Sequence, residues 1–386
     1  MYSGGLKKIV VVVNSNKNLI KISPLIDKFA RYYDFLEPII LYTSSPFSKL
    51  EAAYLFDELK LPKPHIYLNV KNGAYPECTS QTMIEADKCF TELKPDMIIV
   101  SGGSDAALGT AISAARIGIK IAHIEAGLRC PGNVSGTDIN RKMVDSISDM
   151  FFVTDCNAHT NIKAEGNPEE SIFFVGNIMI DAMNKFMPLA KNSRTPESLG
   201  LVPNGYALLS LHRKANTTNF ENMKGIISAA RQISRSMPVV FVCYPRVKEE
   251  IKKFGLLENF NERDLILYDL YKYPDFLALE KGAALMMTDS GTMQVESSAL
   301  GIPCLTIRKN TEWIATVKEG TNIIVGPFPE KITAAAEMII ANKTRTTSVP
   351  KYWDGNTAAR IADIIAKSFT RIEPGTRKIK TNNPFE

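Results

Sequence analysis

Polar residues that could do chemistry directly follow four apolar runs of this sequence. The run IKIAHI is followed by Glu125, YALLSL by His-Arg at 212–213, ALMMT by Asp-Ser-Gly at 289–291, and DMIIV by Ser-Gly-Gly-Ser-Asp at 101–105. A carboxylate and an imidazole can transfer protons, and cations can neutralise an anionic group beside them. Each position also fits a surface loop or a structural role, so the arrangement of the surrounding helices and strands is needed to tell a functional role from a structural one.

The corner at 289–291 has the most specific sequence of the four. Residues 288–305 read TDSGTMQVESSALGIPCL, in which a helix-like segment follows Ser-Gly and ends at Gly301 and Pro303. A strand that stops at Ser-Gly and opens a helix directs free backbone N–H groups outward, which suits an anion. An ordinary strand–helix turn would look the same. Taken jointly, however, the polar residues at these strand ends suit a diphosphate-linked substrate.

The elements that must position these residues are short apolar runs that alternate with longer helical stretches. A first series, which we expect to form buried parallel strands, comprises 7–15, 38–44, 96–103, 119–127 and 149–155. A second series comprises 206–213, 238–245, 265–270, 284–291 and 302–308. Amphipathic segments lie between them, most clearly at 19–33 and 106–118, and complete the βαβ alternation of a doubly wound sheet.

Two such series indicate an α/β protein with two Rossmann-like, doubly wound parallel-sheet domains and a cleft between them. The segment 183–205 is polar, rich in Pro and Asn, and boundary-like. We therefore place an N-terminal domain at 1–180 and a second domain at 181–354. A last helix at about 355–370 could pack against either domain, and we expect 371–386 to be a flexible tail.

Composition and missing motifs exclude several classes of protein. The net charge of +5 is spread along the 386 residues, and the one basic block, GTRKIKTN, resembles a solvated tail more than a nucleic-acid-binding arm. The six cysteines show no C-x-x-C pair, which fits a reducing cytosol and indicates neither disulfides nor zinc. The run IVVVV is too short for a signal peptide or a membrane span. The absence of GK[ST] and G-x-G-x-x-G motifs disfavours ATP and NAD. We therefore expect a cytoplasmic protein without cofactor, metal, nucleic-acid partner or membrane contact.

Seven segments occur in the order and spacing of one known family. They are HIEAGLR (123–129), GNIMIDAM (176–183), LHRKAN (211–216), TDSGTMQVESSALGIPCL (288–305), RKNTEW (308–313), VKEGTNIIVG (317–326) and DGNTAARIADII (354–365). Together they resemble the UDP-N-acetylglucosamine 2-epimerases over nearly the whole chain. The resemblance implies the GT-B fold, a UDP-sugar substrate, a homodimer, and a terminal helix that crosses back to the first domain.

The resemblance also implies roles for matching positions. Ser290 and Gly291 would bind the diphosphate, Glu296 would bind the ribose hydroxyls, and the backbone of Phe276 would meet the uracil ring. The further substrate-binding positions are cationic: Lys21, Arg213 and Arg308. The catalytic positions are Glu125, Asp138, His212, Arg141 and Asp105.

The chemistry of the family explains why carboxylates are needed. Epimerisation proceeds through elimination of UDP across C1 and C2 of the sugar. A base must remove the proton at C2, cations must stabilise the departing diphosphate, and an acid must return a proton on the other face. Hydrolysing relatives add water to the intermediate and release the free sugar with UDP.

The sequence departs from the family pattern at two of three acidic positions. The G-D-T motif is GGS (102–104), which places Gly103 where the family has a catalytic Asp, with Asp105 two residues on. The P-E-E-x-N-R motif is GTDINR (136–141), which places Thr137 where the family has a functional Glu and leaves Asp138. Neutral residues cannot transfer protons at these points.

Two phosphate-binding motifs also differ from the family pattern. The family's G-T-R-P-E is NSNKN (14–18), so its phosphate-binding Arg is Asn16, and Lys17 next to it could compensate. The family's G-H-R is LHR, with Leu211 in place of Gly. The nucleotide-holding positions of the second domain are otherwise retained.

Three functions therefore stay open. The one we expect is a 2-epimerase with altered acids, acting on UDP-N-acetylglucosamine or a close UDP-2-acetamido sugar. The second is a hydrolysing relative or a UDP-sugar lyase, which needs fewer well-placed acids. The third is a glycosyltransferase or a catalytically silent nucleotide-sugar binder on the same fold.

Overall fold

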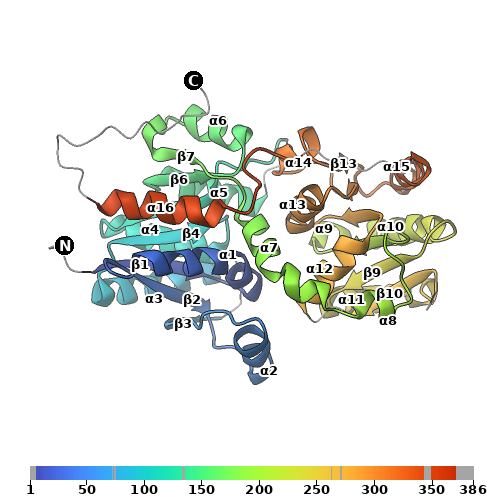
Figure 1. Cartoon of the computed structure of the whole chain (residues 1–386), viewed down its shortest axis with the longest axis horizontal. Coiled ribbons are helices and arrows are strands. Elements are labelled where there is room, and N and C mark those ends of the chain that lie inside the picture. Colours follow the sequence, from blue (N-terminus) through green and yellow to red (C-terminus); the bar gives the residue numbers. More distant parts are fainter. Residues whose placement is uncertain are drawn as a thin grey trace.

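Two parallel sheets form the framework of this chain, in a computed structural model that describes residues 6–71, 73, 75–132, 135–261, 263–269, 272–342 and 349–370. The two sheets lie side by side, and helix α7 (Ile178–Lys191) runs between them (Figure 1). The expected tail at 371–386, with its basic block, lies outside the described residues.

The first sheet has seven strands in the order β3-β2-β1-β4-β5-β6-β7, and all neighbours pair in parallel. Its central strands are apolar and β-branched, as in KKIVVVV of β1, because helices cover both faces of such a sheet. The strands are β1 (Lys7–Val13), β2 (Leu36–Ser44), β3 (Ile66–Val70), β4 (Met97–Ser101), β5 (Lys120–Ala126), β6 (Met150–Val153) and β7 (Ile172–Phe174).

The second sheet repeats this winding with six strands in the order β10-β9-β8-β11-β12-β13, again all parallel. The strands are β8 (Ala207–Ser210), β9 (Val239–Cys243), β10 (Leu265–Asp269), β11 (Leu285–Thr288), β12 (Cys304–Thr306) and β13 (Asn322–Ile324). The prediction of two doubly wound parallel-sheet domains is therefore confirmed.

Helices connect the strands in both domains. Those of the first domain are α1 (Asn16–Phe29), α2 (Lys49–Ala52), α3 (Tyr75–Leu93), α4 (Asp105–Arg116), α5 (Gly136–Ser146) and α6 (Cys156–Ala164). Those after α7 are α8 (Thr195–Ser198), α9 (Lys214–Thr217), α10 (Phe220–Ile233), α11 (Pro245–Lys253), α12 (Tyr273–Gly282), α13 (Gly291–Leu300), α14 (Ile314–Lys318), α15 (Pro329–Asn342) and α16 (Thr357–Phe369). A single π-helical turn, η2, follows α2 at Ala53–Glu58.

Serine side chains fix where three helices begin near the ends of the first-domain strands. The hydroxyl of Ser15 accepts a hydrogen bond from Asn18 N in α1, and that of Ser104 accepts one from Ala107 N in α4. Ser135 and Asp138 form a reciprocal capping box at the start of α5. Each cap satisfies a free N–H group of the first turn and so sets the length of the preceding loop.

The last helix joins the first domain. Helix α16 packs on α1 and α7, and its Ile361 and Ile365 are fully buried there. The carboxylate of Asp181 on α7 accepts hydrogen bonds from Thr357 N (3.2 Å) and Ala358 N (2.9 Å), which caps α16. The terminal helix therefore crosses back to the first domain, as the resemblance implied.

The boundary-like segment 183–205 is partly helical. Helix α7 continues to Lys191, with Pro188 inside it, and straddles the predicted boundary at 180/181. Leu277 and Val295 of the second domain join the same buried apolar cluster as α7 and α16, so an apolar contact links the domains. No helix in the described part of the chain is both long and apolar enough to cross a membrane.

Candidate active site

The predicted site residues lie on α1, at the end of β5, and on the loops and helices that follow β4, β5, β8, β10, β11 and β12. The first sheet reverses between β1 and β4, and the second reverses between β8 and β11. In open parallel sheets ligands bind beyond the carboxyl ends of the strands at such points. The two ends meet here, because the ammonium group of Lys17, at the start of α1, lies 4.5 Å from the centre of the Tyr244 ring in the second domain.

Asp289 ties the loop after β8 to the start of α13. Its carboxylate accepts hydrogen bonds from His212 N (2.7 Å), Arg213 N (3.1 Å) and the amide of Asn216 (2.8 Å). Asp289 is fully buried, and burial raises its pKa, against which these three donors act. The structure thereby holds His212 and Arg213 beside Ser290, whose own N–H donates to the Thr288 hydroxyl (3.0 Å), at the N-terminus of α13, a position that suits an anion.

Two arginines converge on Glu312 at this end of the second sheet. Arg213 Nη2 lies 3.4 Å from Glu312 Oε1, and Arg308 Nη2 lies 2.5 Å from Glu312 Oε2. Although burial opposes ionisation, Arg308 and Arg213 hold the pKa of Glu312 below its ordinary value. Nη1 of Arg308 is buried and has no hydrogen-bond partner among the described residues, so it can donate to a ligand.

Loops of both domains touch beside Arg308. The amide of Asn310 donates to the carbonyl of Pro131 (2.6 Å), and the Cys130 thiol donates to Asn310 Oδ1 (3.1 Å). Arg308 Nη2 lies 3.8 Å from Cys130 Sγ. The loop that follows β5 therefore reaches the cationic side chains of the second domain.

His212 is held as a neutral imidazole. Burial, together with the neighbouring cations Lys17 and Arg246, lowers its pKa to about 3. Its ring lies 4.6 Å from that of Tyr244, centre to centre. Part of the Lys17 side chain is exposed to solvent. Its ammonium group is surrounded by protein atoms, and this burial lowers the pKa of Lys17, while the negative charge of Glu296 partly offsets the effect.

Glu296 lies deeper in α13 and is fully buried. Its Oε1 accepts a hydrogen bond of 2.6 Å from the Tyr273 hydroxyl. Burial raises the pKa of Glu296 to about 7, while Tyr273 and Glu280 act to lower it. Phe276, on the facing helix α12, places its ring in the apolar core of the second domain.

Glu125 and Lys21 meet on the first-domain side. Lys21 Nζ lies 2.8 Å from Glu125 Oε2, and both side chains are largely buried. Glu125 has a φ of 65°, in the left-handed region that residues other than glycine seldom adopt. The backbone thus turns at Glu125, the next-to-last residue of β5, and presents its carboxylate beside Gly102.

The other two predicted acids make local contacts. Asp138 Oδ1 accepts a hydrogen bond from Arg141 Nη1 (3.2 Å), and Asp105 Oδ1 accepts one from the Asn140 amide (2.8 Å). Arg141 also donates to the carbonyl of Leu128 (3.4 Å), and its buried Nε has no partner among the described residues. Arg141 of α5 therefore contacts the loop that follows β5 and the Glu125 turn.

Gly103 has no room for the acid that the family carries there. A Cβ atom on Gly103 would lie 2.2 Å from the carbonyl oxygen of Thr137 and 2.9 Å from Arg141 N. These distances are short because the loop after β4 packs directly against α5. The two departures from the family pattern, Gly103 and Thr137, are therefore in contact.

Sequence reasoning missed several residues around the site. Glu280 and Tyr273 stand in helix α12, and Glu312 lies within RKNTEW without an assigned role, so only their contacts in three dimensions reveal them. No group of three or more His, Cys, Asp or Glu side chains in the described ranges is arranged to hold a metal ion.

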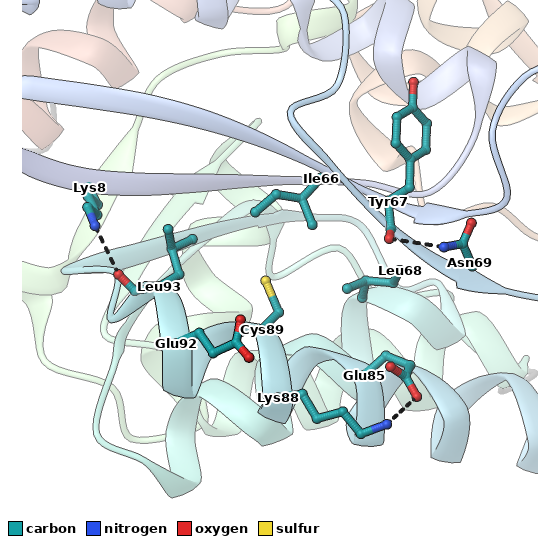
Figure 2. A pocket seen from close by; sticks show the side chains of 10 residues that line it. All are labelled: Lys8, Ile66, Tyr67, Leu68, Asn69, Glu85, Lys88, Cys89, Glu92 and Leu93. Atoms are coloured by element: carbon teal, nitrogen blue, oxygen red, sulfur yellow. Dashed lines mark hydrogen bonds and ion pairs between the residues drawn. The ribbon is translucent and has the colours of Figure 1, made fainter.

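A separate surface pocket lies at the edge of the first sheet, between β3 and α3 (Figure 2). Its volume is about 530 Å³. Among its lining residues, Lys88 forms an ion pair with Glu85, and the ammonium group of Lys8 donates to the carbonyl of Leu93. Its described lining residues include none of the predicted site residues: Lys8, Ile66, Tyr67, Leu68, Asn69, Glu85, Lys88, Cys89, Glu92 and Leu93. This pocket is not the site described above.

Comparison with known proteins agrees with the fold. Residues 31–366 match the family described as UDP-N-acetylglucosamine 2-epimerase. The chain is similar to the UDP-N-acetylglucosamine 2-epimerase of Methanocaldococcus jannaschii, with 34% identity over 93% of this chain and 98% of that protein. It is 30% identical to the UDP-2,3-diacetamido-2,3-dideoxy-D-glucuronate 2-epimerase of Pseudomonas aeruginosa, over 93% of this chain and 99% of that protein.

A solved structure supports the same assignment. The crystal structure of Methanocaldococcus jannaschii UDP-GlcNAc 2-epimerase in complex with UDP-GlcNAc and UDP superimposes with a TM-score of 0.84 and 32% sequence identity. The match covers 93% of this chain and 99% of that chain, so both domains take part in it. The GT-B fold expected from the sequence is confirmed, and the chain belongs to the UDP-N-acetylglucosamine 2-epimerase family.

Proposed function

We propose that this protein is a 2-epimerase of UDP-2-acetamido sugars, with UDP-N-acetylglucosamine as the first substrate to test. The observation that carries this proposal is that the loop just after the buried Lys21–Glu125 pair contacts Arg308 and Asn310 of the second domain. One side offers a carboxylate for proton transfer, and the other offers donors for a diphosphate. The named activities of the family members above point the same way.

The second domain would hold the nucleotide. The Ser290 hydroxyl and the N–H of Gly291, together with Arg213 and Arg308, would bind the diphosphate. The free Nη1 of Arg308 supports this, because a buried guanidinium donor without a partner is stabilised by an incoming anion. Glu296 would bind the ribose once the Tyr273 hydroxyl yields its place on Oε1.

Lys17 would replace the phosphate-binding arginine that the family has at Asn16. It reaches across from α1 to Tyr244 and lowers the pKa of His212, next to which it lies. The neutral His212 ring can then donate one hydrogen bond to a phosphate oxygen without carrying a charge. Lys17 supplies the positive charge that stabilises the departing diphosphate.

Glu125 would exchange the proton at C2 of the sugar. Removal of that proton leaves an electron pair that forms the C1–C2 double bond, while the C1–O bond breaks and UDP leaves with its electrons. UDP then adds back to C1, and C2 takes a proton on the opposite face. Asp138 and Asp105 are the other acids predicted for the first-domain side, because Gly103 and Thr137 carry none.

Incubation with UDP-N-acetylglucosamine in deuterated water tests this function. An epimerase places deuterium at C2 and yields the UDP-linked N-acetylmannosamine, whereas a hydrolysing enzyme yields free UDP and free sugar. Tight binding with no deuterium at C2 would exclude both enzyme functions for this substrate. Glu125→Gln should abolish deuterium uptake and leave UDP affinity unchanged, and retained uptake would show that another residue exchanges the proton.

We also propose that the protein works as a homodimer in the cytoplasm. Membership of the family supports the dimer, and the six cysteines, all free thiols, fit a reducing compartment. Sedimentation of the purified protein at micromolar concentration tests the dimer. A monomer that is fully active would contradict this assembly.

A further inference from the structure

A buried network of charged side chains surrounds the backbone of Glu125. Asp145, near the end of α5, is fully buried, and its carboxylate has three donors. His123 Nδ1 lies 2.6 Å from Oδ1, while Gly127 N (3.1 Å) and Arg129 Nη2 (2.7 Å) both contact Oδ2. One carboxylate thus joins residues two before, two after and four after Glu125 on the same stretch of chain.

Both ring nitrogens of His123 face hydrogen-bond acceptors. Nδ1 faces the Asp145 carboxylate, and Nε2 lies 2.9 Å from the carbonyl oxygen of Gly102. A neutral imidazole has one N–H and one lone pair, and a lone pair directed at a carbonyl oxygen would be repelled. This geometry is satisfied when His123 carries hydrogen on both nitrogens and forms an ion pair with the Asp145 carboxylate.

The charges of this network are balanced by its members. Although burial opposes ionisation, His123 and Arg129 hold the pKa of Asp145 below its ordinary value. Arg129 is shared with Glu165 on the surface, at 2.6 Å. Lys21, from α1, faces the same strand through Glu125. The network is therefore an ion-paired cluster that Arg129 links to the surface.

The network fixes both sides of the strained turn at Glu125. The backbone at Glu125 has a φ of 65°, a strained conformation that persists only where the surroundings hold it. His123 also fixes Gly102, whose N donates to Ile124 O (3.0 Å) and whose Cα side faces Glu125 Oε2. Loss of the charge on Asp145 would release His123, Gly127 and Gly102 together.

We propose that Asp145, acting through the doubly protonated His123, is the positioning residue that aims Glu125 at C2 of the sugar. The proposal rests on the proposed role of Glu125 in proton exchange. Asp145 does not touch the substrate in this arrangement, because its side chain is fully buried behind β5. Its effect would appear in the rate of proton exchange and leave the affinity for UDP, which the second domain binds, unchanged.

The first test uses Asp145→Asn, which keeps the shape and removes the charge. We expect the rate of deuterium uptake at C2 to fall about 100-fold, since a displacement of about 1 Å from reacting geometry has an effect of that size. KM and the Kd for UDP should stay within about twofold. An unchanged kcat, or a Kd for UDP that rises with the fall in kcat, would overturn the proposal.

Asp149→Asn is the matched control. Asp149 Oδ2 accepts a hydrogen bond of 2.7 Å from Ile121 N at the opposite end of the same strand, so its loss weakens β5 without reaching Glu125. We expect this variant to keep its kcat. If both variants lose activity in proportion to their stability, the role of Asp145 is merely structural and the proposal fails.

The second test is spectroscopic and needs no turnover. With ¹⁵N-labelled histidine, His123 should show two protonated ring nitrogens at neutral pH in the unliganded protein, and only four histidines have to be assigned. One protonated and one unprotonated nitrogen would refute the ion pair, even if Asp145→Asn fails to fold. If the wild-type protein does not exchange the C2 proton, the proposed function fails. The spectrum would still show whether His123 and Asp145 form an ion pair.

Discussion

Replacing Glu280 by glutamine should flatten the dependence of stability on pH. Glu280 and Glu296 are both fully buried on facing helices α12 and α13, within hydrogen-bonding reach of one another. Neither oxygen of Glu280, nor Oε2 of Glu296, has a donor among the described residues. Burial and the neighbouring Glu296 raise the pKa of Glu280 well above its ordinary value, so at neutral pH Glu280 keeps a proton that it can donate to Glu296.

The sign and size of the effect follow from proton binding. Between about pH 5 and pH 7 the folded chain retains the Glu280 proton, while an unfolded chain has lost it, because an ordinary Glu titrates near 4.3. Each proton that only the folded state retains lowers the unfolding free energy by about 1.4 kcal/mol per pH unit as pH rises. This stabilising contribution is complete below the unfolded pKa and is lost as pH rises. An amide at this position has no such proton to lose, so Glu280→Gln should gain up to about 3 kcal/mol relative to the wild type between pH 5 and 7.

Urea denaturation at several pH values between about 5 and 8 measures this difference. Glu92→Gln, which changes an exposed residue of α3, is the control and should give a curve parallel to that of the wild type. The amide that Glu280→Gln introduces can donate to Glu296 in place of the acid, so the fold should persist. Parallel curves for Glu280→Gln and wild type would show that Glu280 is ionised in the folded protein, and the reasoning would be wrong.

Three further substitutions test other contacts. Lys17→Ala should raise the Kd for UDP about 10- to 100-fold in calorimetry, because a charge-assisted contact is worth about 1.5–3 kcal/mol; an unchanged Kd would remove Lys17 from the phosphate site. Gly103→Asp should lower the unfolding free energy by about 1–3 kcal/mol in urea and should not raise the activity, because its Cβ would meet the Thr137 carbonyl at 2.2 Å. A variant that is as stable as the wild type and faster would show that α5 can move. Asp181→Ala should lower stability by about 1 kcal/mol, since two N–H groups of α16 lose their acceptor, and an unchanged Tm would contradict the cap.

Most of the fold could be predicted from the sequence because buried parallel strands appear in it as uninterrupted apolar runs. Strands β1, β2, β4, β5 and β6 all fall within predicted segments or within two residues of them. Strands β3 (IYLNV), β7 (IFF) and β13 (NII) were not predicted. They stand at sheet edges, where runs are short and carry polar residues, so no periodicity distinguishes them from loops.

The site was predictable only as far as strand ends and motifs reach. Glu125, His212 and Ser290 follow apolar runs, and a doubly wound topology brings such positions together. The buried pairing of Glu280 with Glu296 was not predictable, because the two residues belong to separate helices that meet only through packing. Nor does the sequence reveal that the Thr137 carbonyl fills the place of a side chain at Gly103.

The return of α16 to the first domain sets the order in which a growing chain can fold. Residues 7–174 leave the ribosome first, yet the apolar faces of α1 and α7 stay uncovered until residues 357–369 have been made. The second sheet, which needs only residues 207–324 for its strands, can close its own core earlier. The domain synthesised first is thus completed last, and while it waits its unpaired apolar surface is a natural target for chaperones.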